Sequence, residues 1–175
     1  KALDEPLLKK PVPFRPEIAA VIDEQSMLCV AAGGHVVTRP GVYEARAALG
    51  RMGAPYGQYL QDDVLNGRVK AKVYVFLNSW RMTAAERAKL LAATRGATRV
   101  WCYAPGYLDD TQPSPDAMRQ LTGFALKPVT PATARATPTD QGRKLGLQTE
   151  FGAKQAVKPV FAAVDARPDE ILATY

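Results

Sequence analysis

Polar and aromatic side chains follow several apolar runs of this 175-residue sequence, at places where they could take part in chemistry. The three loops that carry them are residues 23–26, 78–81 and 104–109. Ligands of open α/β sheets bind at the carboxyl ends of the strands, so these loops are where a site is expected. The side chains that we expect to contact a ligand or a partner are Asn78, Ser79, Trp80, Tyr103 and Tyr107.

Nucleophilic catalysis would need a serine or cysteine on a sharp turn, beside a base. Ser79 follows an apolar run directly, but its neighbours Asn78 and Trp80 are too bulky for a nucleophile elbow. Cys102 is expected inside a strand, where a thiol packs rather than attacks. Since His35 is the single histidine of the sequence, we predict that this chain holds no catalytic residues.

Two pairs of neighbouring carboxylates, Asp62–Asp63 and Asp109–Asp110, could suggest glycoside hydrolysis, which uses two carboxyl groups. Adjacent side chains normally point apart, however. Acids in loops are also commonly solvated or cap helices. We therefore expect these pairs to be structural.

Metal and cofactor sites are not predicted either. The two cysteines, Cys29 and Cys102, form no C-x-x-C pair and cannot make a zinc site with one histidine. Both have apolar neighbours, which predicts buried free thiols. The Gly33-Gly34 pair lacks the spacing of dinucleotide- and phosphate-binding loops and is interpreted as a turn.

The basic character of the chain does not indicate nucleic-acid binding. The formal charge is +6 and the isoelectric point about 9.4. A surface that follows phosphates needs clustered cations. Here basic and acidic residues are interleaved, so no nucleic-acid partner is expected. No run of about 18 apolar residues occurs either, which argues against a membrane span.

Short apolar runs alternate with helical patterns, which predicts a parallel sheet with helices on both of its faces. We expect one α/β domain over residues 17–175, after a proline-rich linker over 1–16 that leads in from an upstream region. We interpret the Lys1-Ala2 start, without a signal-peptide pattern, as that expected of an internal segment. Within the domain, residues 130–156 should form an irregular excursion or a weak edge hairpin. The expected strands are 17–23, 56–60, 73–78, 100–104, 124–129, 159–165 and 170–175, and the expected helices are 42–52, 83–94 and 115–122.

Three ordered stretches carry a family resemblance: residues 53–63, residues 74–87 and residues 100–108. Together they resemble the trimerisation domain of bacterial β-galactosidase-like enzymes, similar to glycoside hydrolase family 42. The resemblance implies a flavodoxin-like three-layer sandwich of the class I glutamine amidotransferase type, without that enzyme's catalytic cysteine. It also implies that the chain has a catalytic barrel of the same parent protein as its partner and forms a homo-oligomer. Carbohydrate would be a partner only indirectly, through that barrel.

Two other functions remain open. One is a small hydrolase or amidotransferase that uses Cys102 or Ser79 as its nucleophile. The other is a carbohydrate-binding module in which Trp80 and Tyr107 stack on sugar rings.

Overall fold

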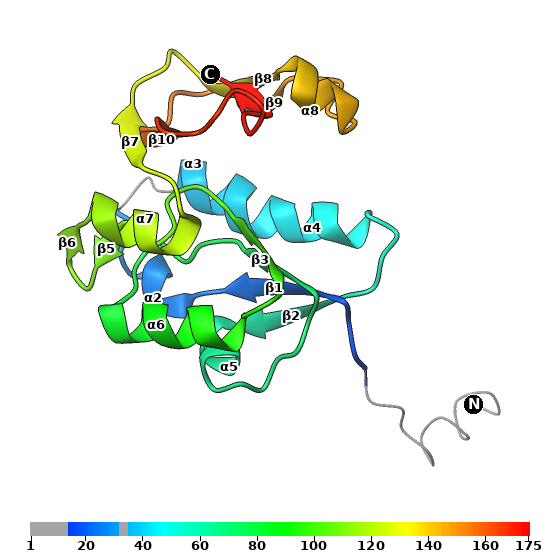
Figure 1. Ribbon diagram of the computed structural model, residues 1–175, viewed down its shortest axis with the longest axis vertical. Helices are drawn as coiled ribbons and strands as arrows, with labels where there is room; N and C mark the ends of the chain where they lie inside the picture. The colour runs from blue at the N-terminus through cyan, green and yellow to red at the C-terminus, as the bar shows by residue number, and fades with distance from the viewer. Residues whose placement is uncertain (1–13, 32–34) are drawn as a thin grey trace.

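The computed structural model describes residues 14–31 and 35–175, so most of the expected 1–16 linker and the Gly33-Gly34 turn lie outside the described residues. The chain is a mixed α/β protein built on a four-stranded, all-parallel sheet of order β2-β1-β3-β4. Figure 1 shows helices on both faces of this sheet. The strands are β1 (Ile18–Ile22), β2 (Tyr56–Leu60), β3 (Val73–Phe76) and β4 (Thr98–Trp101).

The central strands are those whose residues can be buried on both faces. In β1 the middle residues Ala19, Ala20 and Val21 are fully buried, and in β3 Tyr74 and Phe76 are. The continuous burial of β1 is typical of an inner strand of a parallel sheet, and in β3 Val73 and Val75 between and beside the buried residues are half-buried. The strands predicted here are confirmed, although β3 ends at Phe76 and β4 begins and ends earlier than expected.

One face of the sheet is covered by a single helical stretch that comprises α3 (His35–Thr38), the π-helix η1 (Arg39–Glu44) and α4 (Ala45–Gly50). The helix predicted over 42–52 therefore begins earlier and ends at Gly50. Pro40 explains the π-helical segment, because proline has no N–H to donate in the α-helical ladder. Gly53, the expected stop, lies in the turn that follows and has a φ of 78°.

The opposite face carries α5 (Gln61–Leu65) and α6 (Ala84–Ala93) (Figure 1). The capping box predicted for α6 is confirmed: Thr83 Oγ1 accepts from Glu86 N, and the Glu86 carboxylate accepts from Thr83 N. The helix α7 (Pro115–Thr122) is capped by Ser114 and stopped by Gly123 at a φ of 82°, also as expected. A further short helix, α2 (Glu24–Met27), follows β1.

The C-terminal third does not extend the parallel sheet, which corrects the expectation of closing strands. β7 (Leu126–Val129) pairs antiparallel with β10 (Val160–Ala163), and β8 (Ala134–Pro138) pairs with β9 (Phe151–Ala153) and with β11 (Ala173–Thr174). β7 is largely exposed and contains Pro128, so it is unsuited to an inner strand. The expected excursion over 130–156 is the β8–β9 hairpin, which encloses the helix α8 (Asp140–Lys144).

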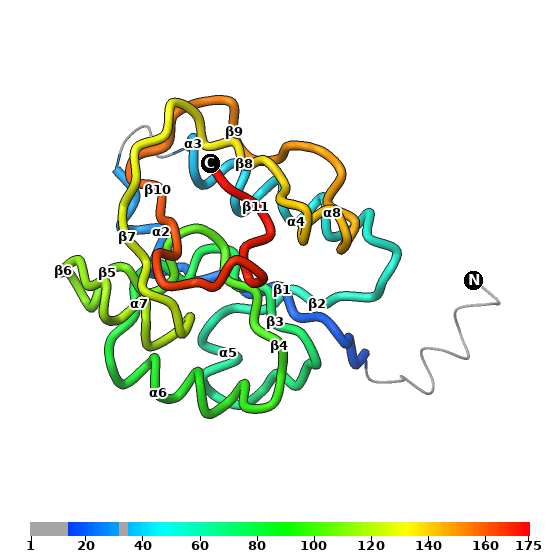
Figure 2. The backbone as a smooth tube through the Cα atoms, turned by 45° about the horizontal axis from the view of Figure 1, so that its top comes forward, coloured from blue at the N-terminus to red at the C-terminus, as the bar shows by residue number. Residues whose placement is uncertain are grey.

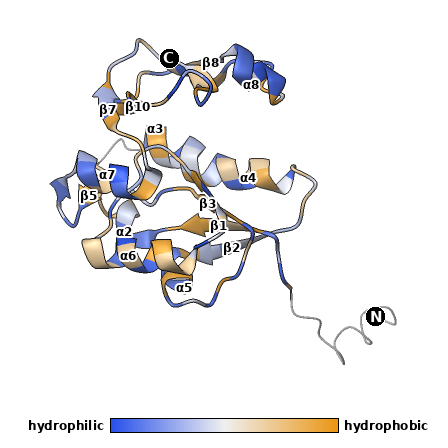
Figure 3. Cartoon of the chain, in the orientation of Figure 1, coloured by the Kyte–Doolittle hydropathy of each residue, from blue (hydrophilic) through white to orange (hydrophobic). Residues whose placement is uncertain are grey.

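Figures 1 and 2 place these C-terminal strands on the side of the sheet that α3 and α4 cover. Colouring by hydropathy shows a difference between the parallel sheet and the C-terminal segment: β1 and β3 are largely apolar, whereas α8 is strongly polar (Figure 3). A small hairpin of β5 (Leu108–Asp109) and β6 (Gln112–Pro113) lies between the parts in sequence. The carboxyl ends of β3 and β4 meet the C-terminal strands through the aromatic residues described below.

Candidate functional site

Asn78 links the carboxyl ends of β1 and β3. Its Oδ1 accepts a hydrogen bond from the Asp23 main-chain N at 2.8 Å, and its Nδ2 donates to the Asp23 carbonyl at 2.7 Å. The side chain is fully buried. The amide thus continues the ladder between the two strands past their ends, and both of its polar atoms are used by the fold.

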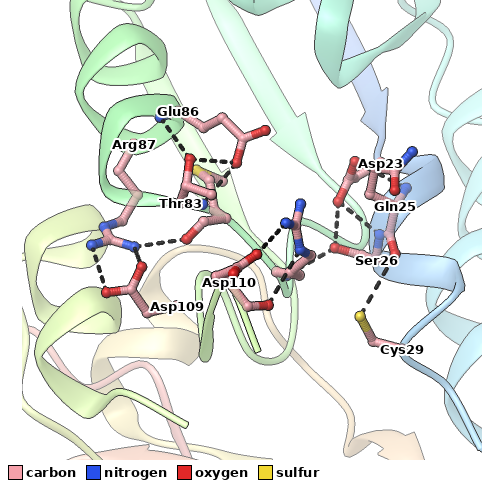
Figure 4. Close-up of polar contacts among 11 residues, drawn as sticks. Asp23, Gln25, Ser26, Cys29, Thr83, Glu86, Arg87, Asp109 and Asp110 are labelled. Carbon is pink, nitrogen blue, oxygen red and sulfur yellow. Dashed lines mark hydrogen bonds and ion pairs between the residues drawn. The ribbon is translucent and has the colours of Figure 1, made fainter. Parts of the chain in front are cut away.

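Asp23 and Ser26 hold the next loop in the same way (Figure 4). The Asp23 carboxylate caps α2 by accepting from the main-chain N atoms of Gln25 and Ser26, and it also accepts from the Ser26 hydroxyl. Ser26 Oγ in turn accepts from Trp80 N and Arg81 N, each at 2.9 Å. Burial raises the pKa of Asp23, and the hydrogen bonds from Ser26 and Gln25 partly offset that rise.

Ser79, the hydroxyl that follows β3, is only 1% exposed, and its Oγ has no hydrogen-bond partner among the described residues. An activated serine needs a base within hydrogen-bond distance and access to a substrate. Neither is provided by the described residues. The hydroxyl is buried rather than presented to a substrate on an elbow.

The three predicted aromatic contacts do come together, around Phe161 of β10. Trp80 meets Tyr103 edge to face with ring centroids 5.7 Å apart, and Tyr103 and Tyr107 approach Phe161 at 6.1 and 4.9 Å. Tyr103 has a φ of 68°, a conformation that is rare for a bulky residue. Its hydroxyl donates to the Pro159 carbonyl at 2.7 Å. These rings therefore join the strand-end loops to the C-terminal strands.

A cavity of about 970 Å³ opens beside this aromatic cluster. It brings together regions that are distant in sequence: the α3–η1 helix, the ends of β3 and β4, and the β9 strand with the segment that follows it, together with single residues of β8 and β10 and Tyr175. Of the five predicted contact residues, Trp80 and Tyr103 line it, whereas Asn78, Ser79 and Tyr107 do not. The sequence pattern missed the lining residues His35, Arg39, Glu44, Phe151, Lys154 and Gln155, since no local motif marks them.

The thiol of Cys102 and the imidazole of His35 both line this cavity, so the cysteine-hydrolase alternative has a specific location. Cys102 lies directly after β4, not inside it as expected. Burial raises the pKa of Cys102, which favours the protonated thiol over the nucleophilic thiolate. Cys29 is exposed, so the prediction of a buried thiol there was wrong; it lies past the end of α2, outside the core.

The neighbouring aspartates Asp109 and Asp110 bind two different arginines, as Figure 4 shows. Arg87 is only 4% exposed and holds Asp109 through both guanidinium NH groups, at 3.0 and 3.3 Å. This contact lowers the pKa of Asp109. Asp110 pairs instead with Arg81. The two carboxylates thus act separately, in line with the structural role expected of them.

The pair Asp62–Asp63 lies in the first turn of α5, where carboxylates interact favourably with the helix dipole. Asp63 also pairs with Arg68 at 3.3 Å. This pair too has the structural role that was expected of it.

Within residues 14–31 and 35–175, no three His, Cys, Asp or Glu side chains are grouped closely enough to hold a metal ion. None of the helices described there is long and apolar enough to cross a membrane. No protein-family model, curated protein or solved structure matches the chain.

Proposed function

We propose that the chain is a non-catalytic accessory domain of a larger bacterial glycoside hydrolase of the β-galactosidase type. In this role it packs against a catalytic barrel of the same parent protein and holds subunits together. The observation that carries the proposal is the use of the strand-end groups by the fold: Asn78, Asp23 and Ser26 bind the main chain of neighbouring loops. Buried groups engaged in this way hold the loops in place rather than attack a substrate.

The finer fold assignment is part of the same proposal. A parallel sheet of order β2-β1-β3-β4 with helices on both faces is compatible with a flavodoxin-like sandwich of the class I glutamine amidotransferase type. In that enzyme class a cysteine nucleophile is required. Here the residue after β4 is Cys102, a thiol whose pKa is raised, and it is followed by the bulky Tyr103 in the left-handed conformation.

The outer edge of β4 supports a role in assembly. β4 is the last strand of the parallel sheet and pairs only with β3 among the described strands. The other edge of β4 is therefore unpaired within the described residues. Val100 is 43% exposed on this strand. The strand contains no lysine or proline, although the exposed Arg99 places one charge on it, and an open edge of this kind can pair with another chain.

Turnover assays test the non-catalytic part of the proposal. The chain is incubated with chromogenic galactosides, chromogenic esters and glutamine, beside a Ser79→Ala/Cys102→Ala double variant. We expect no turnover above the double variant. Turnover that the double variant lacks would favour a small hydrolase and overturn the proposal.

Light scattering tests self-association through β4. We expect Val100→Lys to lower the average mass of the chain in solution while its circular dichroism stays unchanged, because a lysine at an edge opposes strand pairing. Lys89→Arg, an exposed change on α6 that keeps the charge, serves as control. A monomeric chain, or an assembly unaffected by Val100→Lys, would remove the role of this edge.

The reading frame of the parent protein tests the partner. We expect a barrel domain with two acidic residues at strand ends beside this chain. A parent protein without such a domain would overturn the glycosidase assignment even if the chain proved inert.

A further inference from the structure

We infer that the cavity between the α3–η1 helix, the ends of β3 and β4, and the β9 strand is a binding site for a neutral saccharide. This inference goes beyond the accessory role and does not depend on it. The cavity volume of about 970 Å³ lies at the upper end of small-molecule sites, which span about 300–1,000 Å³. It has room for an oligosaccharide of a few rings.

Aromatic side chains supply the apolar part of the wall. Trp80 and Tyr103 line the side nearest the sheet, and Phe151 lines the side formed by β9. Phe151 is 47% exposed, so its ring is available for stacking. The C–H face of a pyranose stacks on such rings, because the aromatic surface is removed from water while the sugar hydroxyls stay at the edge.

The polar part of the wall combines hydrogen-bond donors with an acceptor. Arg39 Nε lies 3.0 Å from Glu44 Oε1, and both side chains are well exposed at the cavity. A sugar hydroxyl can accept a hydrogen bond from the guanidinium and donate one to the carboxylate beside it. Lys154 and Gln155 add further polar groups from the segment after β9.

The Arg39–Glu44 part of the wall favours a neutral ligand over an anion, although Lys154 adds a further positive charge to the lining. Glu44 accompanies Arg39, so the guanidinium is already compensated, and the carboxylate would repel a phosphate placed beside it. A phosphate site would present several cations without a carboxylate at the same place.

Trp80 adds an independent observation. It is 6% exposed and lines the cavity, yet its indole Nε1 is buried without a hydrogen-bond partner among the described residues. A buried donor without an acceptor costs free energy. Nε1 is shielded from the cavity as well as from water, so a ligand oxygen would reach it only through a movement of the Trp80 side chain.

Fluorescence of a single-tryptophan protein tests the site. The sequence has two tryptophans, and Trp101 stacks on Phe76 outside this cavity, so Trp101→Phe leaves Trp80 as the reporter. The probes are lactose, cellobiose, mannobiose and maltotriose, with glucose 6-phosphate as an anionic comparison. We expect a saturable change in emission with at least one neutral probe and a weaker or absent response to the phosphate.

Two variants in this background locate the binding. Phe151→Ala and Glu44→Gln should each weaken binding by about tenfold or more, as expected for the loss of a stacking ring or a charged hydrogen bond. The matched controls Phe14→Ala and Asp62→Asn change exposed residues that do not line the cavity, and they should leave binding unchanged. Circular dichroism verifies that all four variants keep the fold.

Several results would overturn the inference: no response to any neutral probe, preferred binding of the phosphate, or neutral binding that neither Phe151→Ala nor Glu44→Gln weakens. None of these bears on whether the chain turns over a substrate or has a barrel partner. Failure of the saccharide site is therefore distinguishable from failure of the accessory role.

Discussion

The hydroxyl of Tyr103 donates to the carbonyl of Pro159 across 2.7 Å, which joins the loop after β4 to the segment that leads into β10. The two residues are 56 positions apart in sequence. The bond therefore contributes to the attachment of the antiparallel C-terminal strands to the parallel sheet.

Removal of this hydroxyl should weaken that attachment. We expect Tyr103→Phe to lower the free energy of unfolding by about 1 kcal/mol, the usual net contribution of one hydrogen bond. Urea denaturation measures the change. Tyr43→Phe, at an exposed tyrosine, should have almost no effect. Equal stability of the Tyr103→Phe and Tyr43→Phe variants would show that the bond does not contribute.

Arg87 should be the most sensitive of the described arginines. Its guanidinium is buried and binds the Met82 carbonyl, Asp109 and Gln120, so Arg87→Met leaves several groups without a partner. We expect a loss of about 2 kcal/mol or more in the free energy of unfolding.

Arg119→Met is the matched control for this change. Arg119 pairs with Asp165 at the surface, and loss of such a pair costs at most about 1 kcal/mol. Thermal or urea denaturation compares the two variants. An Arg119→Met variant as unstable as Arg87→Met would show that burial of the Arg87 guanidinium does not determine its contribution to stability.

The features that the sequence predicted correctly are those that depend on near neighbours. Helix caps are an example, because each depends on residues close together in the sequence. They are the capping box of Thr83 and Glu86 and the start and stop of α7 at Ser114 and Gly123. The inner strand β3 is likewise marked by an unbroken apolar run. Local signals of this kind survive in the fold because nothing distant competes with them.

The features that the sequence did not predict depend on distant segments. The run that forms β10 has the composition of an inner strand, yet it pairs with β7 outside the parallel sheet. The cavity combines Glu44 with Phe151, residues that no sequence spacing relates. Trp80 and Tyr103 were identified because they lie near the ends of expected strands. Their partners on α3–η1 and β9 follow no such rule.

The two cysteines should differ in reactivity towards thiol reagents. Cys29 is exposed, whereas burial raises the pKa of Cys102 and so reduces its thiolate fraction at neutral pH. We expect rapid labelling of one thiol and slow labelling of the other, monitored by mass spectrometry.

The Cys29→Ser variant assigns the fast thiol. It should lose rapid labelling, and full denaturation should restore reaction at Cys102. Fast labelling of Cys102 in the folded Cys29→Ser variant would instead support an activated thiol in the cavity that His35 also lines, and with it the hydrolase alternative.

Asp23 should make the stability of the chain depend on pH in the direction opposite to Asp109. Burial raises the pKa of Asp23 above its ordinary value of 3.8, so the folded state binds a proton more readily than the unfolded state does. The contribution of Asp23 is then fully present below about pH 4 and is lost as the pH rises through its folded pKa. The stability of the wild type relative to Asp23→Asn should fall over that interval.

Asp109→Asn provides the comparison of opposite sign. Arg87 lowers the pKa of Asp109, so its contribution is present above 3.8 and is lost as the pH falls. The stability of the wild type relative to Asp109→Asn should therefore rise with pH in the acid range. Urea denaturation from about pH 3 to 7 measures both differences. A wild-type curve that runs parallel to the Asp23→Asn curve would show that the buried carboxylate at the end of β1 is fully compensated by Ser26 and Gln25, since only an uncompensated desolvation makes the two states differ in proton affinity.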